Sequence, residues 1–438
     1  MATTAAETLS PRDANLAGVA QFLRRGALLN GIIALITLVL GGIAAARLIS
    51  FETLRAVLLF NYAGSADVAL AIMIMLALIN LSLMLVLTVG VLAREVWSLP
   101  AVWGLALANL ALLIVLGWVV AVINLGLCAW VGIRLSREIA SLRVNPVMIK
   151  ELRGRMRGVR AFAVITVYLG LMSGFAGLIY LIYAAGNRAS GSAAAGEIGR
   201  VLFLGIVGIE LLLIIFIAPA FTAGAITGER ERQTYDLLRT TLLSIPSFVI
   251  GKLESALGYI LLLLLAAIPL QSIAFLFGGV TEAEVILSFV ILTVTAIALG
   301  TVGIYFSAAM VRTLNASVRA YTAILVVMFI APVIIGVILR VISNVFSMQQ
   351  SLLFSPGMET LFKYADLLLT SINPIATGLT SQQLLINQSV AGFYSFTLAS
   401  NGSTIPMVSP WITFTILYLA LSAALIVFTI RNTHETEL

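Results

Sequence analysis

The chain has 438 residues, of which 61% are hydrophobic and only 10% are charged. Soluble globular domains carry about a quarter charged residues, whereas long apolar stretches are typical of membrane spans. We therefore predict an all-α fold, a polytopic membrane helical bundle, and exclude a soluble globular domain. The apolar stretches are continuous rather than alternating, unlike the strands of a transmembrane barrel.

Cysteine and histidine occur once each, at Cys128 and His434. A single cysteine excludes an intrachain disulfide framework, and a single histidine excludes a histidine metal cluster within one chain. The sequence also lacks a Gly-x-x-x-x-Gly-Lys-Ser/Thr phosphate loop and the residues for a Ser-His-Asp set. We therefore expect no catalytic site, no metal and no cofactor bound by this chain.

Residues 1–26 are polar and rich in small residues, so we expect a cytoplasmic or loose N-terminal tail. Residues 27–133 are expected to form an accessory transmembrane domain of three or four spans. The first two spans are predicted at residues 27–49 and 68–92.

The stretch 101–133 is harder to divide into spans. As one helix it would be about 50 Å long, more than a bilayer core needs. Two spans would place Arg24, Arg25 and Arg94 on the same side of the membrane. However, no proline or polar turn divides the stretch, so we prefer one tilted helix over two spans.

Residues 134–160 carry eight Lys and Arg against two Asp and Glu. Basic segments beside a span stay cytoplasmic, and this position favours a topology signal over nucleic-acid binding. Asn145-Pro146 is typical of a helix start. Apolar and basic side chains then fall on different faces, which predicts an amphipathic interfacial helix rather than a solvated linker. The residues assigned to this helix are Asn145, Pro146, Lys150, Glu151, Arg153, Arg155 and Arg157.

Six further spans are expected between residues 161 and 431. Five of them precede a segment, 343–410, that has only three charges and is expected on the outer side with one or two short helices. Residues 432–438 would form a cytoplasmic tail. The six predicted spans are 161–185, 201–226, 248–277, 285–310, 321–342 and 411–430.

A polar stretch, 228–252, separates two of these apolar segments. Charges at bilayer depth are costly, so this stretch is predicted to be a short cytoplasmic loop with helical character. Its alternating charges can pair with a partner, and its apolar side chains can serve as anchors. The alternative is a loop whose charges only stabilise a helix. The residues assigned to a partner interface are Glu229, Arg230, Glu231, Arg232, Thr234, Tyr235, Asp236, Leu237 and Leu238.

Glu210 is the one acidic residue predicted deep within a span. An ionisable group at that depth is a candidate for a translocation pathway. A structural carboxyl, hydrogen-bonded to a neighbouring helix, is an equally consistent interpretation.

Two motifs resemble one family. Asn145-Pro146-Val147 followed by Lys150-Glu151-Leu152-Arg153-Gly154-Arg155-Met156-Arg157 resembles the entry helix of ABC-2 type transporter permeases. The segment from Gly224 to Leu238 resembles the exit of the second span and the first cytoplasmic loop of the same family. The resemblance covers residues 143–431, whereas 1–133 does not match the family's core. One departure is Leu242, where relatives often have proline.

The resemblance implies a multi-pass permease subunit of the inner (cytoplasmic) membrane, with the termini of its core in the cytoplasm. It implies six spans that form half of a translocation pathway, completed by a second permease copy or a paralogue. A separate ATPase subunit, present in two copies, would hydrolyse ATP and dock on loop 228–247, the coupling helix. Membrane lipids would surround the bundle, no nucleic acid would bind, and transport would be export. The alternatives are a gradient-driven secondary transporter or channel and a non-transporting membrane scaffold.

Overall fold

The computed structural model describes residues 11–45, 59–61, 66–138, 145–157, 159–186, 192–235, 244–330, 332–334, 336–337, 341, 356–388, 390–398, 400 and 402–435. Within these residues, ten helices are long and apolar enough to cross a membrane, and the only sheet has two strands. The protein is thus an all-α polytopic membrane bundle, as its composition predicts.

The chain divides into two compact units. The first comprises Met1–Pro146 with two strand segments, Phe393–Thr397 and Thr404–Met407. The second comprises Val147–Gly392, Leu398–Ser403 and Val408–Leu438.

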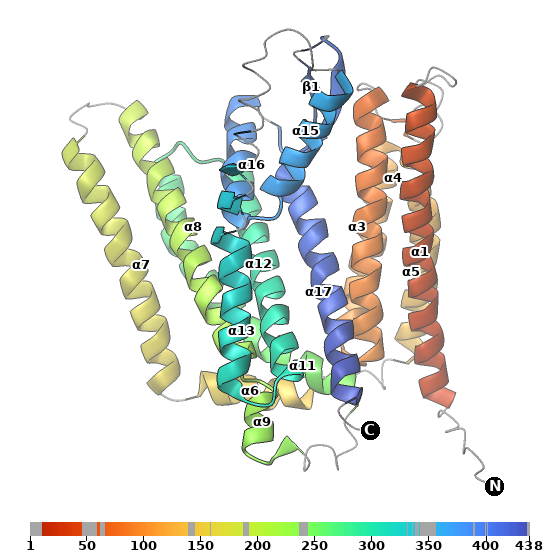
Figure 1. Cartoon of the computed structure of the whole chain (residues 1–438), viewed down its shortest axis with the longest axis vertical. Helices are drawn as coiled ribbons and strands as arrows, with labels where there is room; N and C mark the ends of the chain where they lie inside the picture. The colour runs from red at the N-terminus through yellow and green to blue at the C-terminus, as the bar shows by residue number, and fades with distance from the viewer. Residues whose placement is uncertain are drawn as a thin grey trace. The chain divides into compact units, whose positions relative to one another are not determined.

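The first unit is a four-helix bundle (Figure 1). Helix α1 packs along α3, and α4 packs along α5. Strand β1 pairs with β2 and lies against α3, where Phe393 contacts an apolar cluster around Trp118. The bounds are α1 (Pro11–Ala45), α3 (Ala66–Leu92), α4 (Ser98–Leu116), α5 (Val120–Arg137), β1 (Phe393–Thr397) and β2 (Thr404–Val408).

The prediction of a loose tail over residues 1–26 is wrong from Pro11 onward, where α1 begins. Leu16, Val19 and Leu23 recur at helical spacing and are buried in the core of the first unit. Polar residues occupy the opposite face of these turns and lower the average hydropathy of the segment. A search for an apolar stripe at helical spacing, instead of for high average hydropathy, would have predicted this helix.

The prediction of a single helix over residues 101–133 is also wrong, because α4 and α5 are separate helices of 19 and 18 residues. Gly117 ends α4 in the left-handed conformation, with φ of 67°, and its N–H bonds to the carbonyl of Leu113. Glycine adopts this conformation without a Cβ penalty, so the helix ends without a proline or a polar turn. The fully buried Trp118 then starts the return into the bundle.

Four buried asparagines, one on each helix, join the helices of the first unit. Asn30 of α1 and Asn124 of α5 exchange hydrogen bonds of 2.8 and 3.1 Å. Asn109 of α4 donates to Asn80 of α3 at 2.8 Å. Amide pairs between helices substitute for the water that a membrane interior lacks, and they also fix the register of the helices.

In the second unit the helices pack around α12, which contacts α8, α11, α13, α16 and α17. The helices that could cross a membrane lie over the six predicted spans. The bounds are α6 (Pro146–Met156), α7 (Val159–Gly186), α8 (Ser192–Thr222), α9 (Thr227–Glu231), α11 (Ile245–Leu276), α12 (Glu282–Ala309), α13 (Thr313–Leu325) with a π-helical continuation (Val326–Ile330), α15 (Pro356–Thr370), α16 (Pro374–Gln388) and α17 (Pro410–Glu435).

Local signals account for several helix ends in this unit. The hydroxyl of Ser244 accepts the N–H of Ser247 and caps α11, and the carboxamide of Asn373 accepts two N–H groups at the start of α16. The segment between the fifth and last spans contains two short helices, as predicted, and in addition the β-hairpin, which was not predicted. Two strands of five residues are too short to show a clear alternation.

Replacing Gly117 with alanine is expected to destabilise the first unit by about 1–3 kcal/mol. A Cβ atom there would lie 2.7 Å from the backbone nitrogen of Asn61, and the positive φ adds strain. The measurement is the midpoint of thermal unfolding in detergent. Gly104→Ala is the matched control on α4, because its Cβ meets nothing within 4 Å. Equal midpoints for the two variants would contradict the role of Gly117.

Candidate functional site

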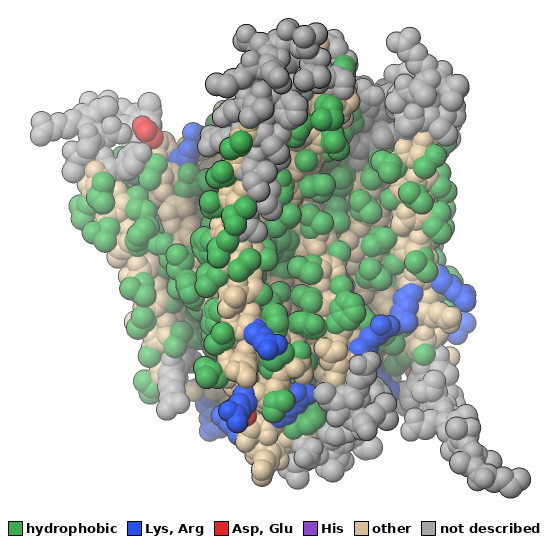
Figure 2. All heavy atoms as spheres, viewed as in Figure 1, with side chains coloured by type: hydrophobic (Ala, Val, Ile, Leu, Met, Phe, Trp, Pro, Cys, Tyr) green, Lys and Arg blue, Asp and Glu red, His purple; other side chains and the backbone are tan. Residues whose placement is uncertain are grey.

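One end of the second unit carries many of its basic residues. Figure 2 shows Lys and Arg side chains gathered where α6 and α9 lie, below a face covered by hydrophobic side chains. We call this the basic end. Among its described residues, Lys150, Arg153, Arg157 and Arg232 have exposed side chains.

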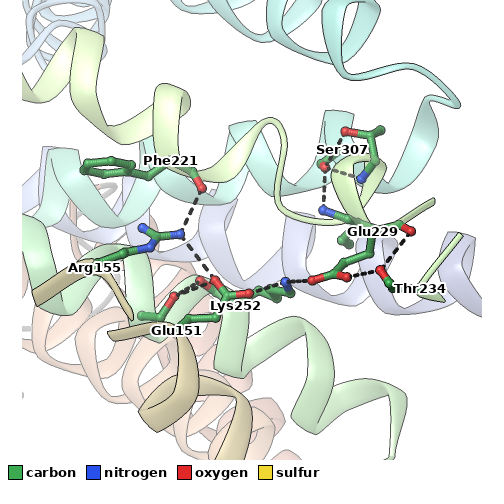
Figure 3. Close-up of polar contacts among 10 residues, drawn as sticks. Glu151, Arg155, Phe221, Glu229, Thr234, Lys252 and Ser307 are labelled. Atoms are coloured by element: carbon green, nitrogen blue, oxygen red, sulfur yellow. Dashed lines mark hydrogen bonds and ion pairs between the residues drawn. The ribbon is translucent and has the colours of Figure 1, made fainter. Parts of the chain in front are cut away.

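A buried ammonium group lies at the centre of the basic end. Lys252, in the second turn of α11, has a side chain that is only 4% exposed and forms ion pairs with two carboxylates. One belongs to Glu229 of α9, at 2.7 Å, and the other to Glu151 of α6 (Figure 3). One cation therefore links three segments that are distant in the sequence.

Glu151 has further partners on its second oxygen. Oε2 accepts hydrogen bonds from Ser255 Oγ at 3.3 Å and from Arg155 Nη2 at 3.4 Å. The Arg155 guanidinium lies 4.8 Å from the ring centre of Phe221 and donates to the Phe221 carbonyl. Burial lowers the pKa of Arg155, and the neighbouring charge of Glu151 opposes that shift. These contacts fasten α6 to the end of α8.

Helix α9 is held just as closely on its other side. Arg230 Nη1 donates to the carbonyls of Ala308 and Met310, at 3.0 and 3.1 Å, at the end of α12. Glu231 accepts the N–H of Thr313 at 2.7 Å and its hydroxyl at 2.9 Å, at the start of α13. A carboxylate at a helix N-terminus is favourable for both charge and hydrogen bonding.

Ser307 of α12 also contributes to this fixation, because its hydroxyl oxygen accepts the backbone N–H groups of Ile226 and Thr227 (Figure 3). We call the set Glu151, Arg155, Glu229, Arg230, Glu231, Lys252, Ser307 and Thr313 the charged junction. It connects α9 to α6, α8, α11, α12 and α13.

The structure divides the predicted interface residues into two groups. Glu229, Arg230 and Glu231 contact other segments of the same chain, whereas Arg232 makes an exposed turn with Gln233, whose φ is 58°. Thr234 is exposed too, and its hydroxyl bonds to the Glu229 carboxylate.

Tyr235 packs edge-on against Phe248, with ring centres 6.0 Å apart. The remaining three predicted residues, Asp236, Leu237 and Leu238, lie outside the described residues.

The residues assigned to the interfacial helix also fall into two groups, those that contact other parts of the chain and those that are exposed. Pro146 is the first residue of α6, and the Asn145 amide donates to Glu95 Oε1 at 2.7 Å. Burial raises the pKa of Glu95, and this hydrogen bond partly offsets the shift. Glu151 and Arg155 belong to the charged junction, whereas Lys150, Arg153 and Arg157 are exposed.

Lys252 and Ser307 were not predicted as site residues. Lys252 could have been found, because it is a cation inside the predicted span 248–277. Ser307 gives no such signal, since serine is common in membrane helices and its partner is a backbone 80 residues away.

Glu210 lies apart from the charged junction, in the interior of the second unit. Its side chain is 1% exposed, and Oε2 accepts a hydrogen bond from Gln271 Nε2 at 2.8 Å. Its other oxygen has no hydrogen-bond partner among the described residues. It borders a cavity of only about 10 Å³, beside Tyr168. This packing fits a structural carboxyl better than a wall of an open pathway.

Comparison with known proteins assigns no family. A scan against models of protein families matched none of them, and a search of curated proteins found no significant sequence match. Among the described residues, no group of three or more His, Cys, Asp or Glu could hold a metal ion.

Replacing Lys252 with methionine is expected to destabilise the protein by about 3 kcal/mol, because it removes the cation that Glu151 and Glu229 share, while Arg155 still pairs with Glu151. The measurement is the midpoint of thermal unfolding in detergent. Arg153→Met removes a cation from an exposed position on α6 and should leave the midpoint unchanged. Adding Glu151→Gln and Glu229→Gln to Lys252→Met should recover much of the loss. A midpoint for Lys252→Met equal to that of Arg153→Met would refute the central role of Lys252.

Glu210→Gln is expected to destabilise the protein less than Glu210→Leu, since the amide oxygen can still accept from Gln271. Glu210→Leu should cost about 1–3 kcal/mol, because it leaves the Gln271 amide buried without its acceptor. The measurement is the midpoint of thermal unfolding of the two variants in detergent. A leucine variant as stable as the glutamine variant would show that the hydrogen bond is dispensable.

Proposed function

We propose that this chain is the membrane permease subunit of an ATP-binding cassette transporter of the ABC-2 type. Its second unit forms half of a translocation pathway, and a separate ATPase subunit binds at the basic end and supplies the energy. The motifs around α6 and α9 motivate the proposal, and the charged junction is the structural observation that supports it best.

The argument concerns mechanical stiffness. A contact that converts ATP hydrolysis into movement of membrane helices must not yield when it is pushed. Helix α9 has five residues, yet Lys252, Arg230 and Glu231 join it to α6, α11, α12 and α13. A displacement of α9 would therefore be passed to several helices together rather than absorbed by a loop.

The exposed side of α9 is the proposed docking surface. Glu229 and Arg230 are engaged within the chain, so recognition falls to Arg232 and Gln233 at the exposed turn. Lys150 and Arg153 are exposed cations on α6, at the same end of the unit. The partner surface is thus expected to be an acidic groove, since complementary charge steers association and fixes orientation.

Orientation follows from the same charges. Lys and Arg near the ends of spans favour the cytoplasmic side, so the basic end would face the cytoplasm of a cell whose inner membrane holds the protein. ATP would be hydrolysed in two copies of the partner, and a second permease copy or a paralogue would complete the pathway. Export is the direction implied by the family resemblance.

Arg232→Glu is expected to weaken co-purification of the proposed ATPase subunit by about tenfold or more, because it places a repulsive charge at the contact. The thermal midpoint should not change, since Arg232 is exposed. Arg431→Glu is the matched control, with the same change of charge at an exposed residue of α17.

The measurement is the amount of ATPase retained on the immobilised permease, together with ATP hydrolysis by the complex. If Arg232→Glu and Arg431→Glu retain the ATPase equally well, α9 is not the docking element. If no ATPase is retained by the wild-type chain, the proposed function itself fails.

A further inference from the structure

A cavity lies between α8, α12 and α16, in the part of the second unit opposite the basic end (Figure 1). Its volume is about 210 Å³. Apolar side chains form nearly all of its wall, and the polar exceptions are Glu284, Ser288 and Gln382. Pockets that are mostly apolar with a few placed polar groups are the usual form of ligand sites.

The polar groups gather at one end of the cavity. Glu284 lies in the first turn of α12, where its Oε1 accepts from Thr281 and its Oε2 accepts from Gln382 Nε2 at 2.8 Å. Ile291 and Leu292 lie two turns further along α12, about 12 Å deeper by the rise of a helix. The cavity thus has a buried polar end near the start of α12, and the rest of its wall is apolar.

The rim of the cavity consists of apolar side chains that are exposed at the surface of the helix bundle. Leu212 of α8, Phe329 of the π-helical segment and Leu379 of α16 line the cavity and are each more than 40% exposed. In a membrane such a rim is in contact with lipid, so a lipid-like molecule reaches the cavity without crossing water.

We infer that this cavity binds a membrane lipid with a single acyl chain and an uncharged, hydroxyl-bearing head group, such as a monoacylglycerol. The first part of the chain would occupy the apolar interior, where each buried methylene contributes about 0.8 kcal/mol, and the rest would extend past the apolar rim into the membrane. The hydroxyl groups would donate hydrogen bonds to the Glu284 and Gln382 oxygens. An anionic head is disfavoured, because it would approach the Glu284 carboxylate with no cation among the residues that line the cavity.

Two glycines make the inference testable without disturbing the fold. Gly208 of α8 and Gly378 of α16 line the cavity, and a Cβ at either position meets nothing within 4 Å. Leucine at both sites would fill the cavity, and it would also raise helix propensity relative to glycine. Gly174 of α7 is equally open but does not line the cavity, so Gly174→Leu is the matched control.

The experiment uses the full chain in phosphatidylcholine nanodiscs with radiolabelled 1-oleoylglycerol, and with oleate as the anionic lipid of the same chain. The wild type and Gly174→Leu should retain oleoylglycerol saturably, and should bind oleate about tenfold more weakly. The Gly208→Leu/Gly378→Leu variant should bind oleoylglycerol about tenfold more weakly, with an unchanged or higher thermal midpoint. Equal retention by this variant and the control would overturn the site, and equal binding of oleate would overturn the assignment of the head group.

A second measurement does not depend on any variant. A photoreactive monoacylglycerol with a diazirine in the head-group half of its chain should label peptides that contain residues 203–215 or 374–385 of the wild type. Labelling confined to the exposed face of α7 would instead show ordinary lipid contact and would overturn the site. Neither measurement involves the ATPase, so loss of this inference would leave the proposed function unaffected.

Discussion

The ion pairs of Lys252 with Glu151 and Glu229 are the interaction on which the basic end of the second unit depends. A buried cation is stable only when carboxylates pair with it and when hydrogen bonds satisfy the remaining carboxylate oxygens. The arrangement meets this condition through Ser255, Arg155 and Thr234, which donate to the remaining carboxylate oxygens. The position of each of the three segments is therefore conditional on the other two.

This dependence explains why charged residues that look like a contact surface in the sequence are engaged within the chain. Alternating Glu and Arg in a loop suggests residues available to a partner. The pattern contains no sign of their internal partners, which are the acceptor carbonyls of Ala308 and Met310 and the donor groups of Thr313. The exposed turn at Arg232 and Gln233 is small by comparison. In the proposed transporter, most of the charge of this loop would make α9 rigid, and only its tip would recognise the ATPase.

Features encoded by neighbouring residues could be predicted from the sequence. The apolar stretches locate the spans of the second unit, and Ser244 locates the start of α11. Features that depend on a single backbone conformation or on distant partners could not be predicted. Gly117 ends a helix by adopting a positive φ, which composition does not reveal. Lys252 pairs with Glu151, which is 101 positions away in the sequence, and no local pattern specifies that pairing.

The β-hairpin has a consequence for how the protein is synthesised. Its strands complete the first unit, yet β1 begins at Phe393, whereas the last helix of that unit ends at Arg137. At about 5–20 residues per second, a ribosome needs some tens of seconds to make the intervening chain. During that interval the face of α3 that β1 covers stays open, and a fragment ending after α5 would leave it open permanently. The four-helix bundle is therefore made before the second unit, but it is completed only after most of the second unit has been made.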